Sequence, residues 1–225
     1  EFVRHLNRSA RDEGQEGITR RVAPDLVRLV ETTLRRRSEG AAEVVAELDP
    51  LVARWEQEAA PDDFSRSWKN TMVGFGSDTL ADFALLAGQW EKAERAVRVN
   101  IAGIISSGIR SIFDRQTLAA AQIKLAHALA RQGKVTEARA ALAPAEEFMA
   151  DTLGRFRENQ FWLMGAAEMN FVRGLLEDQP GPRRATLAEA DALLASTTGE
   201  FRAMNRGVAE LKRWIDEART ALPAE

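Results

Sequence analysis

The stretch LAAAQIKLAHALARQGKVTEARAALAPAEE, residues 118–147, decides the fold of this chain. Leucines and small alanines recur through its first half at helical spacing, which predicts an apolar stripe along one helix. Gly133 interrupts the pattern, and glycine can adopt the left-handed conformation that ends a helix. A second stripe, with Ala138 and Leu142, follows the glycine. The stretch therefore predicts two antiparallel helices that turn at Gly133 and approach each other closely.

The same pattern occurs once more, 45 residues earlier in the chain. Gly88 precedes Ala93 by the spacing that separates Gly133 from Ala138. These residues resemble the tetratricopeptide helical hairpin, which has a small residue in its first helix, a glycine at the turn and an alanine five residues later. Ala126, Gly133 and Ala138 occupy those places. A tetratricopeptide unit has about 34 residues, so this chain would have longer repeats.

The resemblance implies an all-α fold, a right-handed superhelix of about five antiparallel hairpins whose concave side binds a partner. It implies a non-catalytic module that recognises a protein or peptide. Such arrays are often fused to bacterial regulators, so we expect part of a larger bacterial regulatory or signalling protein. The alternative is a small-molecule sensor that encloses a ligand between its helices.

Composition supports the all-α class and excludes several functions. The chain has 225 residues, 45% of them hydrophobic, with no tyrosine, and it is dominated by strong helix formers. A net charge of −3, from 31 basic and 34 acidic residues, argues against a nucleic-acid partner. No apolar run reaches the roughly 18 residues of a membrane span, and no signal peptide is visible. We therefore expect a cytoplasmic chain without a membrane span.

Proline and glycine divide the chain into two regions, which we expect to form one continuous domain. We expect residues 1–60 to form an N-terminal helical hairpin region and residues 61–225 to form the repeat array. The first region has a helix from about Ala23 to Arg37 and another over 41–59. Pro50 should kink or divide the second helix, because proline removes a helical hydrogen bond.

Three features of the array predict where its helices begin and bend. A helix over 62–87 contains two glycines at 74 and 76, which predict a kink or a division into two helices. A long helix over 151–177 would open the third unit. The sequence Thr186 to Glu189 fits a capping box, which would begin its partner helix.

The last helix, predicted over 199–222, has the clearest amphipathic pattern. Apolar residues from Phe201 to Leu222 recur at alternating three- and four-residue intervals. A helical array exposes an apolar side at its end unless a helix caps it. The same spacing suits a coiled-coil seam in a homodimer, but only about three heptads are present, without consistent charge pairing. We therefore favour an intramolecular cap.

Motifs for catalysis or cofactors are weak. The histidines, His5 and His127, lie far apart and cysteine is absent, which makes a zinc site improbable. The segment 74–79 begins like a phosphate loop but lacks the third glycine and a preceding strand. Residues 106–108 lack the spacing of a nucleophile elbow. We expect no catalytic residue, metal or cofactor.

Candidate binding residues come from the first helices of successive hairpins, because stacked hairpins turn those helices toward the concave side. Arginine and asparagine can hold a peptide main chain or a terminal carboxylate. The candidates are Arg115, Gln122, His127, Arg155, Asn159, Trp162, Asn170 and Arg173. Ordinary surface is the alternative for each polar residue. We favour a partly exposed surface position for His127 and core burial for Trp162.

Overall fold

The structure is a computed structural model that describes residues 40–57, 59 and 63–223. Every regular element within these residues is an α-helix, which confirms the predicted class. The helices are α3 (Ala41–Gln57), α4 (Asp63–Leu86), α5 (Trp90–Ser107), α6 (Ile112–Arg131), α7 (Val135–Thr152), α8 (Gln160–Leu176), α9 (Pro180–Ala195), α10 (Gly199–Met204) and α11 (Arg206–Thr220). None of them combines the length and apolar character that crossing a bilayer would require.

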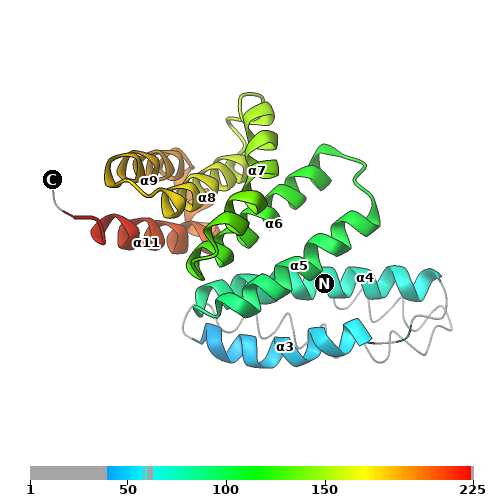
Figure 1. Cartoon of the computed structure of the whole chain (residues 1–225). Coiled ribbons are helices and arrows are strands. Elements are labelled where there is room, and N and C mark those ends of the chain that lie inside the picture. The colour runs from blue at the N-terminus through cyan, green and yellow to red at the C-terminus, as the bar shows by residue number, and fades with distance from the viewer. Residues whose placement is uncertain (1–39, 58, 60–62, 224–225) are drawn as a thin grey trace.

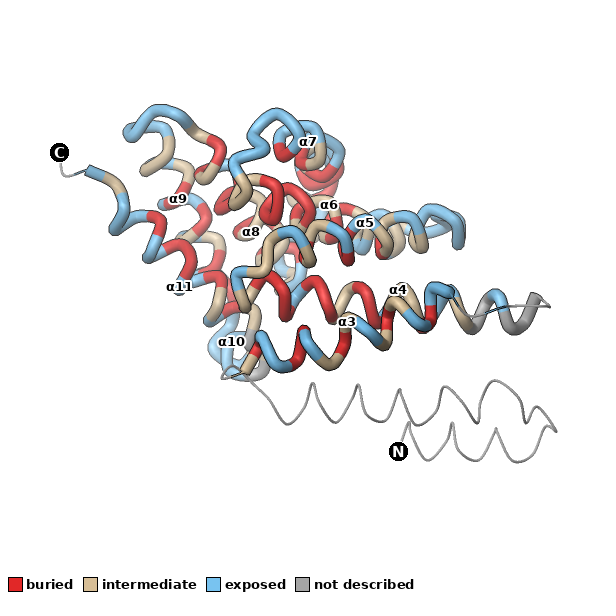
Figure 2. The backbone as a smooth tube through the Cα atoms, turned by 60° about the horizontal axis from the view of Figure 1, so that its bottom comes forward, coloured by how far each residue is buried: buried red, intermediate tan, exposed pale blue. Residues whose placement is uncertain are grey.

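Consecutive helices pack as hairpins, as Figure 1 shows. The pairs α4–α5, α6–α7 and α8–α9 are joined by tight turns, and α3 packs along α4. Buried residues follow the facing sides of these helices in Figure 2, whereas exposed residues follow their outer sides. The predicted arrangement of helical hairpins is therefore confirmed. The right-handed superhelical turn stays a prediction.

The central hairpin forms at the predicted residues. Gly133 has a φ of +74°, and Gly88 has a φ of +69° at the equivalent turn. Both values lie in the left-handed region, where a side chain would be strained. Ala126, Ala93 and Ala138 are completely buried, which lets the paired helices approach closely. Both turns therefore form because a glycine adopts the left-handed conformation.

The predicted division of the helix over 62–87 into two helices is wrong, and the alternative of a kink stays a prediction. This helix continues from Asp63 to Leu86 through both glycines. A Cβ atom on Gly76 would lie 2.7 Å from the indole ring of Trp55 in α3, so this glycine permits close helix packing. Pro50 does not divide α3, which is one helix. The predicted helix Ala23–Arg37 lies outside the described residues.

The third unit begins later than predicted. The expected helix over 151–177 is wrong, because α7 extends to Thr152 and α8 begins only at Gln160. Asn159 precedes α8 with extended backbone, and its Oδ1 accepts a hydrogen bond from the backbone N–H of Phe161 at 3.0 Å. This side-chain cap satisfies one of the free N–H groups that every helix start leaves. A turn over residues 153–159 therefore separates the second and third hairpins.

Helix α9 also starts elsewhere than predicted. It begins at Pro180, whereas the sequence predicted a start at Thr186. Proline suits the first turn of a helix because its missing N–H needs no partner there. The hydroxyl of Thr186 donates to the carbonyl oxygen of Pro182 at 3.0 Å, so it acts inside the helix. The predicted capping box is therefore wrong.

The final apolar stripe forms the predicted cap, but it is divided at Asn205. The Oδ1 atom of Asn205 accepts a hydrogen bond from the backbone N–H of Gly207 at 3.0 Å and begins α11. Helix α11 then packs against α9 and α8. Its buried residues are Val208, Leu211, Trp214, Ile215 and Ala218. The apolar face that a seam between two chains would need is thus covered within the chain.

Candidate functional site

His127 is a core residue, which corrects the expectation of a partly exposed surface position. Its side chain is completely buried on α6. Its ring lies between Trp90, Phe171 and Trp214, at centroid distances of 6.1, 5.2 and 4.8 Å. Nε2 accepts a hydrogen bond from Arg131 at 3.4 Å. Burial, with the charge of Arg131, lowers the pKa of His127 to about 3, so the ring is neutral at physiological pH.

Trp162 is also buried, which confirms the favoured alternative for this residue. Its Nε1–H donates to the Thr152 hydroxyl at 3.2 Å, which joins α8 to the end of α7. The indole stacks on Phe156 with a centroid distance of 4.5 Å. The neighbouring Phe161 is 61% exposed. The apolar residues around Trp162 in the sequence are therefore not all buried.

Asn159 and Arg155 lie in the turn before α8 and not on that helix. Asn159 caps α8 with its side chain, as described above. Arg155 is exposed, and its guanidinium lies 3.7 Å from the carboxylate of Asp151. Exposed ion pairs of this kind contribute little to stability. Neither side chain belongs to the face that the sequence assigned to it.

Asn170 and Arg173 are brought together on α8. The Arg173 guanidinium donates to the Asn170 side-chain oxygen at 3.1 Å and lies 3.3 Å from the carboxylate of Glu146 on α7. Arg173 is exposed, whereas Asn170 is buried. These three residues therefore tie α7 to α8.

The two remaining predicted residues lie on α6. Arg115 is exposed, and its guanidinium stands over the ring of Phe148 at 5.2 Å from the centroid. Gln122 is half-buried farther along the helix. The eight predicted residues are thus spread over a buried core, a turn and two helix surfaces. They do not converge on one pocket.

A different set of residues surrounds a cavity of about 310 Å³ between α4, α6, α8 and α11, which we call the four-helix pocket. Three of these helices are the first helices of hairpins, so the pocket lies on the side that the sequence assigned to binding. Its lining residues are Asp82, Phe83, Leu85, Leu86, Lys124, Met164, Glu168, Asn205, Gly207, Glu210, Leu211 and Trp214.

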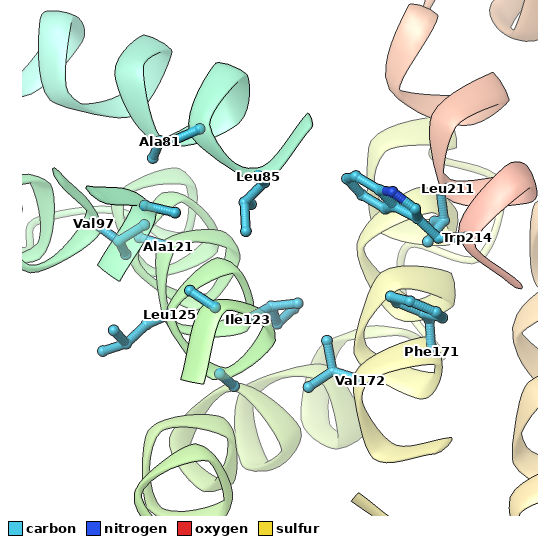
Figure 3. Packing of buried hydrophobic residues seen from close by; sticks show 14 of the residues in the cluster. Ala81, Leu85, Val97, Ala121, Ile123, Leu125, Phe171, Val172, Leu211 and Trp214 are labelled. Carbon is cyan, nitrogen blue, oxygen red and sulfur yellow. The ribbon is translucent and has the colours of Figure 1, made fainter. Parts of the chain in front are cut away.

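The wall of the four-helix pocket is mainly apolar. Figure 3 shows Leu85 of α4 on one side and Leu211 and Trp214 of α11 on the other. Leu211 and Trp214 share a face of α11 because they lie three residues apart. Met164 lines the pocket from α8. A Cβ atom on Gly207 would lie 2.6 Å from the Met164 methyl carbon, so this glycine lets α11 begin close to α8.

An ion-pair network forms the polar side of the pocket. Lys124 Nζ lies 2.8 Å from an Asp78 carboxylate oxygen and 2.7 Å from an Asp82 oxygen. These aspartates lie four residues apart and therefore share one face of α4. Asn100 also donates to Asp78, at 3.1 Å. Burial opposes the charge of Lys124, but the two carboxylates outweigh it and raise the pKa above the usual value.

Glu168 is the unpaired group of the pocket. It lies on α8, four residues after Met164, and is mostly buried. It forms no hydrogen bond or ion pair with the part of the chain that the structure describes. Burial raises its pKa to about 7; Lys124 opposes this rise, and Asp82 and Asp78 add to it. Its carboxyl group is therefore poised to titrate near neutral pH.

A second, more polar depression of about 880 Å³ lies between the start of α4 and the α5–α6 connection. Its side chains are largely occupied with local bonds. Ser106 and Ser107 donate to the carbonyl oxygen of Gly103 at 2.9 Å. Asp114 accepts hydrogen bonds from the backbone N–H groups of Arg110 and Ser111, and these bonds lower its pKa. Arg66 and Arg110, which also line this depression, are exposed, whereas Glu168 is not.

No protein-family description, curated protein or solved structure matches this chain significantly. The fold and the pocket therefore define the protein only as a class. Its described residues form an array of helical hairpins with a partly enclosed, mainly apolar pocket on the side of their first helices. Within the described residues, no group of His, Cys, Asp and Glu side chains is arranged to hold a metal ion.

Proposed function

We propose that this chain is a non-catalytic interaction module that binds a protein or peptide and uses the four-helix pocket as the anchor point. The pocket carries this proposal because it opens among α4, α6 and α8, the first helices of three hairpins. Its volume of about 310 Å³ lies at the lower end of the range for ligand sites. Such a space suits one side chain of a partner better than a large cofactor.

The polar groups of the pocket support a binding role. Among the described residues that line it, none is a serine, threonine, histidine or cysteine that could serve as a nucleophile. Lys124 is held in two ion pairs, and its raised pKa keeps it protonated. A lysine nucleophile or base needs a lowered pKa instead. Lys124 therefore suits charge recognition better than proton transfer.

The hairpin motif supports a regulatory setting. The matching turns at Gly88 and Gly133 and the buried alanines that follow them agree with the tetratricopeptide-like pattern. Arrays of this kind bind partners rather than transform them. We place the chain in a larger bacterial regulatory or signalling protein, as that resemblance implies.

A small-molecule sensor is the second candidate. The observation that favours it is the position of α11, which brings Trp214 and Leu211 across from Leu85 and partly encloses the pocket. Enclosed apolar pockets with a few polar groups are typical of small-molecule sites. A ligand in this space would contact both the hairpins and the capping helix.

The test is to fill the pocket. Met164→Trp places a larger side chain in the lining, and Met169→Trp, also half-buried on α8 but outside the lining, is the matched control. Peptides selected from a displayed library should bind the wild type and Met169→Trp equally. Their affinity for Met164→Trp should fall at least about tenfold, because the anchor side chain is excluded.

Two outcomes would count against the interaction module. One is the absence of any selected peptide, and the other is a set of peptides that bind both variants equally. If a thermal-shift screen of metabolites instead finds a compound that stabilises the wild type and Met169→Trp but not Met164→Trp, the sensor replaces the interaction module.

A further inference from the structure

The described side chains in and beside the four-helix pocket carry more negative than positive charge. Asp82 lines it from α4, Glu168 from α8 and Lys124 from α6, and Asp78 of α4 forms an ion pair with Lys124. Lys124 directs its ammonium group to the two aspartates, at 2.8 and 2.7 Å. Glu168 is left without a partner in the described residues. One further cation would complete the network.

Among the α11 side chains that the structure describes, none supplies that cation to the pocket. Glu210 lines the pocket and is itself acidic. The guanidinium of Arg213 lies 3.0 Å from the Glu210 carboxylate and 2.8 Å from that of Glu217. Arg213 is not among the lining residues. No described side chain of this set therefore supplies a positive charge to Glu168.

The apolar wall limits which cations fit. Leu86, Met164 and Trp214 line the pocket around the charged groups. A small hydrated ion would gain nothing from these side chains. An alkyl chain would displace water from them, and an indole ring also attracts a cation held near it. A cation with an aliphatic stem satisfies both parts of the pocket.

We infer that the four-helix pocket binds an alkylammonium group, which in a protein partner is the side chain of a lysine. Its nitrogen lies at Glu168 and its methylenes lie against Trp214. This inference rests on the proposed function and specifies the residue that the partner inserts. A single ammonium group at one carboxylate forms a charge-assisted hydrogen bond, which is roughly twice as strong as a neutral one. The pKa of Glu168, about 7 when the pocket is empty of a cation, should fall when the ammonium group binds.

The first experiment uses three small probes of similar length: n-pentylammonium, 1-hexanol and hexanoate. Methionine methyl groups labelled with ¹³C report binding, because Met164 lines the pocket and Met169 does not. Pentylammonium should shift the Met164 signal in a saturable way and leave Met169 unchanged. Its affinity should exceed that of hexanoate at least about tenfold, as expected for opposite charges in a partly buried site. Equal affinities for pentylammonium and hexanol, or tighter hexanoate binding, would overturn the inference.

The second experiment changes the carboxylate. Glu168→Gln keeps the size of the side chain and should weaken pentylammonium binding about tenfold or more, while hexanol affinity changes less than about twofold. Glu147→Gln, on the exposed side of α7, is the matched control. If Glu168→Gln does not fold, Met164→Trp provides the test, because it should abolish binding of pentylammonium. Unchanged pentylammonium affinity in a folded Glu168→Gln protein would overturn the inference.

The third experiment identifies the source of the ammonium group. Lysine capped as its N-acetyl, N-methylamide derivative carries main chain on both sides, as a partner would present it. Saturable binding of this probe, lost in Glu168→Gln, supports a lysine side chain. Binding of pentylammonium without the capped lysine would overturn the peptide source and support a free amine. Library peptides that bind without any lysine, and equally well to Glu168→Gln, would overturn the inference while the proposed interaction module stands.

Discussion

His127 of α6 and Trp214 of α11 meet edge to face, with ring centroids 4.8 Å apart and planes at 78°. This contact joins the last helix to the central hairpin, more than eighty residues earlier in the chain. Phe171 completes the cluster, at 5.2 Å from His127 and 6.2 Å from Trp214. Helix α11 therefore does more than cover the third hairpin. It closes one side of the four-helix pocket.

Removing Trp214 should release α11. Trp214→Ala deletes a side chain that is only 9% exposed, and truncation of a buried tryptophan costs about 3–5 kcal/mol. Phe75→Ala is the control, because Phe75 is 54% exposed, and exposed substitutions usually change stability by about 0.5 kcal/mol. Urea denaturation followed by far-UV circular dichroism measures both values. Equal small losses would mean that α11 does not dock on the array.

Overpacking the central hairpin should destabilise it. Ala138 is completely buried where α7 meets its neighbours, so Ala138→Trp should cost about 1–3 kcal/mol or more. Ala140, two residues along α7, is exposed, and Ala140→Trp should leave the protein nearly unchanged. The two thermal midpoints provide the comparison. An unchanged midpoint for Ala138→Trp would contradict the assignment of this hairpin.

The hairpins could be predicted from the sequence because their determinants are local. The turn needs a glycine at 133 for its left-handed backbone, and the close helix contact needs a small side chain at 138, only five residues later. The start of α9 at Pro180 was missed, although proline favours a first helical turn. The caps at Asn159 and Asn205 were missed because asparagine occurs in turns and on helix surfaces as well as at caps. Which role it takes depends on the neighbouring helices.

The pocket could not be predicted, because its residues meet only when α11 folds back on α4, α6 and α8. A sign of it was present: Lys124 lies between Ile123 and Leu125 in a helix that is apolar on most sides. Glu168 likewise follows Met164 by four residues and precedes Phe171 by three, on an apolar stripe. A charged residue on an apolar stripe indicates a buried ion pair or a site. Sequence spacing alone does not show which partner it meets.

Glu168 should make stability depend on pH. Its pKa is raised from 4.5 to about 7 in the folded chain, so the folded chain binds this proton more tightly than the unfolded chain does. The contribution of Glu168 to the free energy of unfolding is therefore complete below pH 4.5 and is lost as pH rises through 7. The loss amounts to about 1–3 kcal/mol. Glu168→Gln stays neutral and should be the more stable protein at pH 8.

The measurement is the difference in unfolding free energy between wild type and Glu168→Gln at several pH values. The difference is needed because His127, whose pKa is lowered from 6.5 to about 3, has the opposite effect. The contribution of His127 is lost as pH falls below 6.5. Subtraction removes this effect, and Glu147→Gln should reproduce the wild-type curve. A difference that is constant from pH 4 to 8 would mean that Glu168 is not buried in the pocket.

The last prediction concerns Gly174, where α8 meets α9. A Cβ atom there would lie 2.8 Å from Leu187 Cδ2 and 2.9 Å from Cγ, and Leu187 is completely buried. Alanine favours a helix over glycine by about 1 kcal/mol, but overpacking costs about 1–3 kcal/mol. Gly174→Ala should therefore destabilise the protein.

A matched control and a rescue make this prediction specific. Gly103 lies within α5 with nothing within 4 Å of its Cβ position, so Gly103→Ala should stabilise the protein by about 0.5–1 kcal/mol. Combining Gly174→Ala with Leu187→Ala should cost less than the sum of the two single changes, because the shortened leucine makes room for the methyl group. Urea denaturation of the four variants gives these free energies. If the two alanine substitutions at glycine have equal effects, or if the costs at 174 and 187 simply add, the close contact between α8 and α9 is not as described.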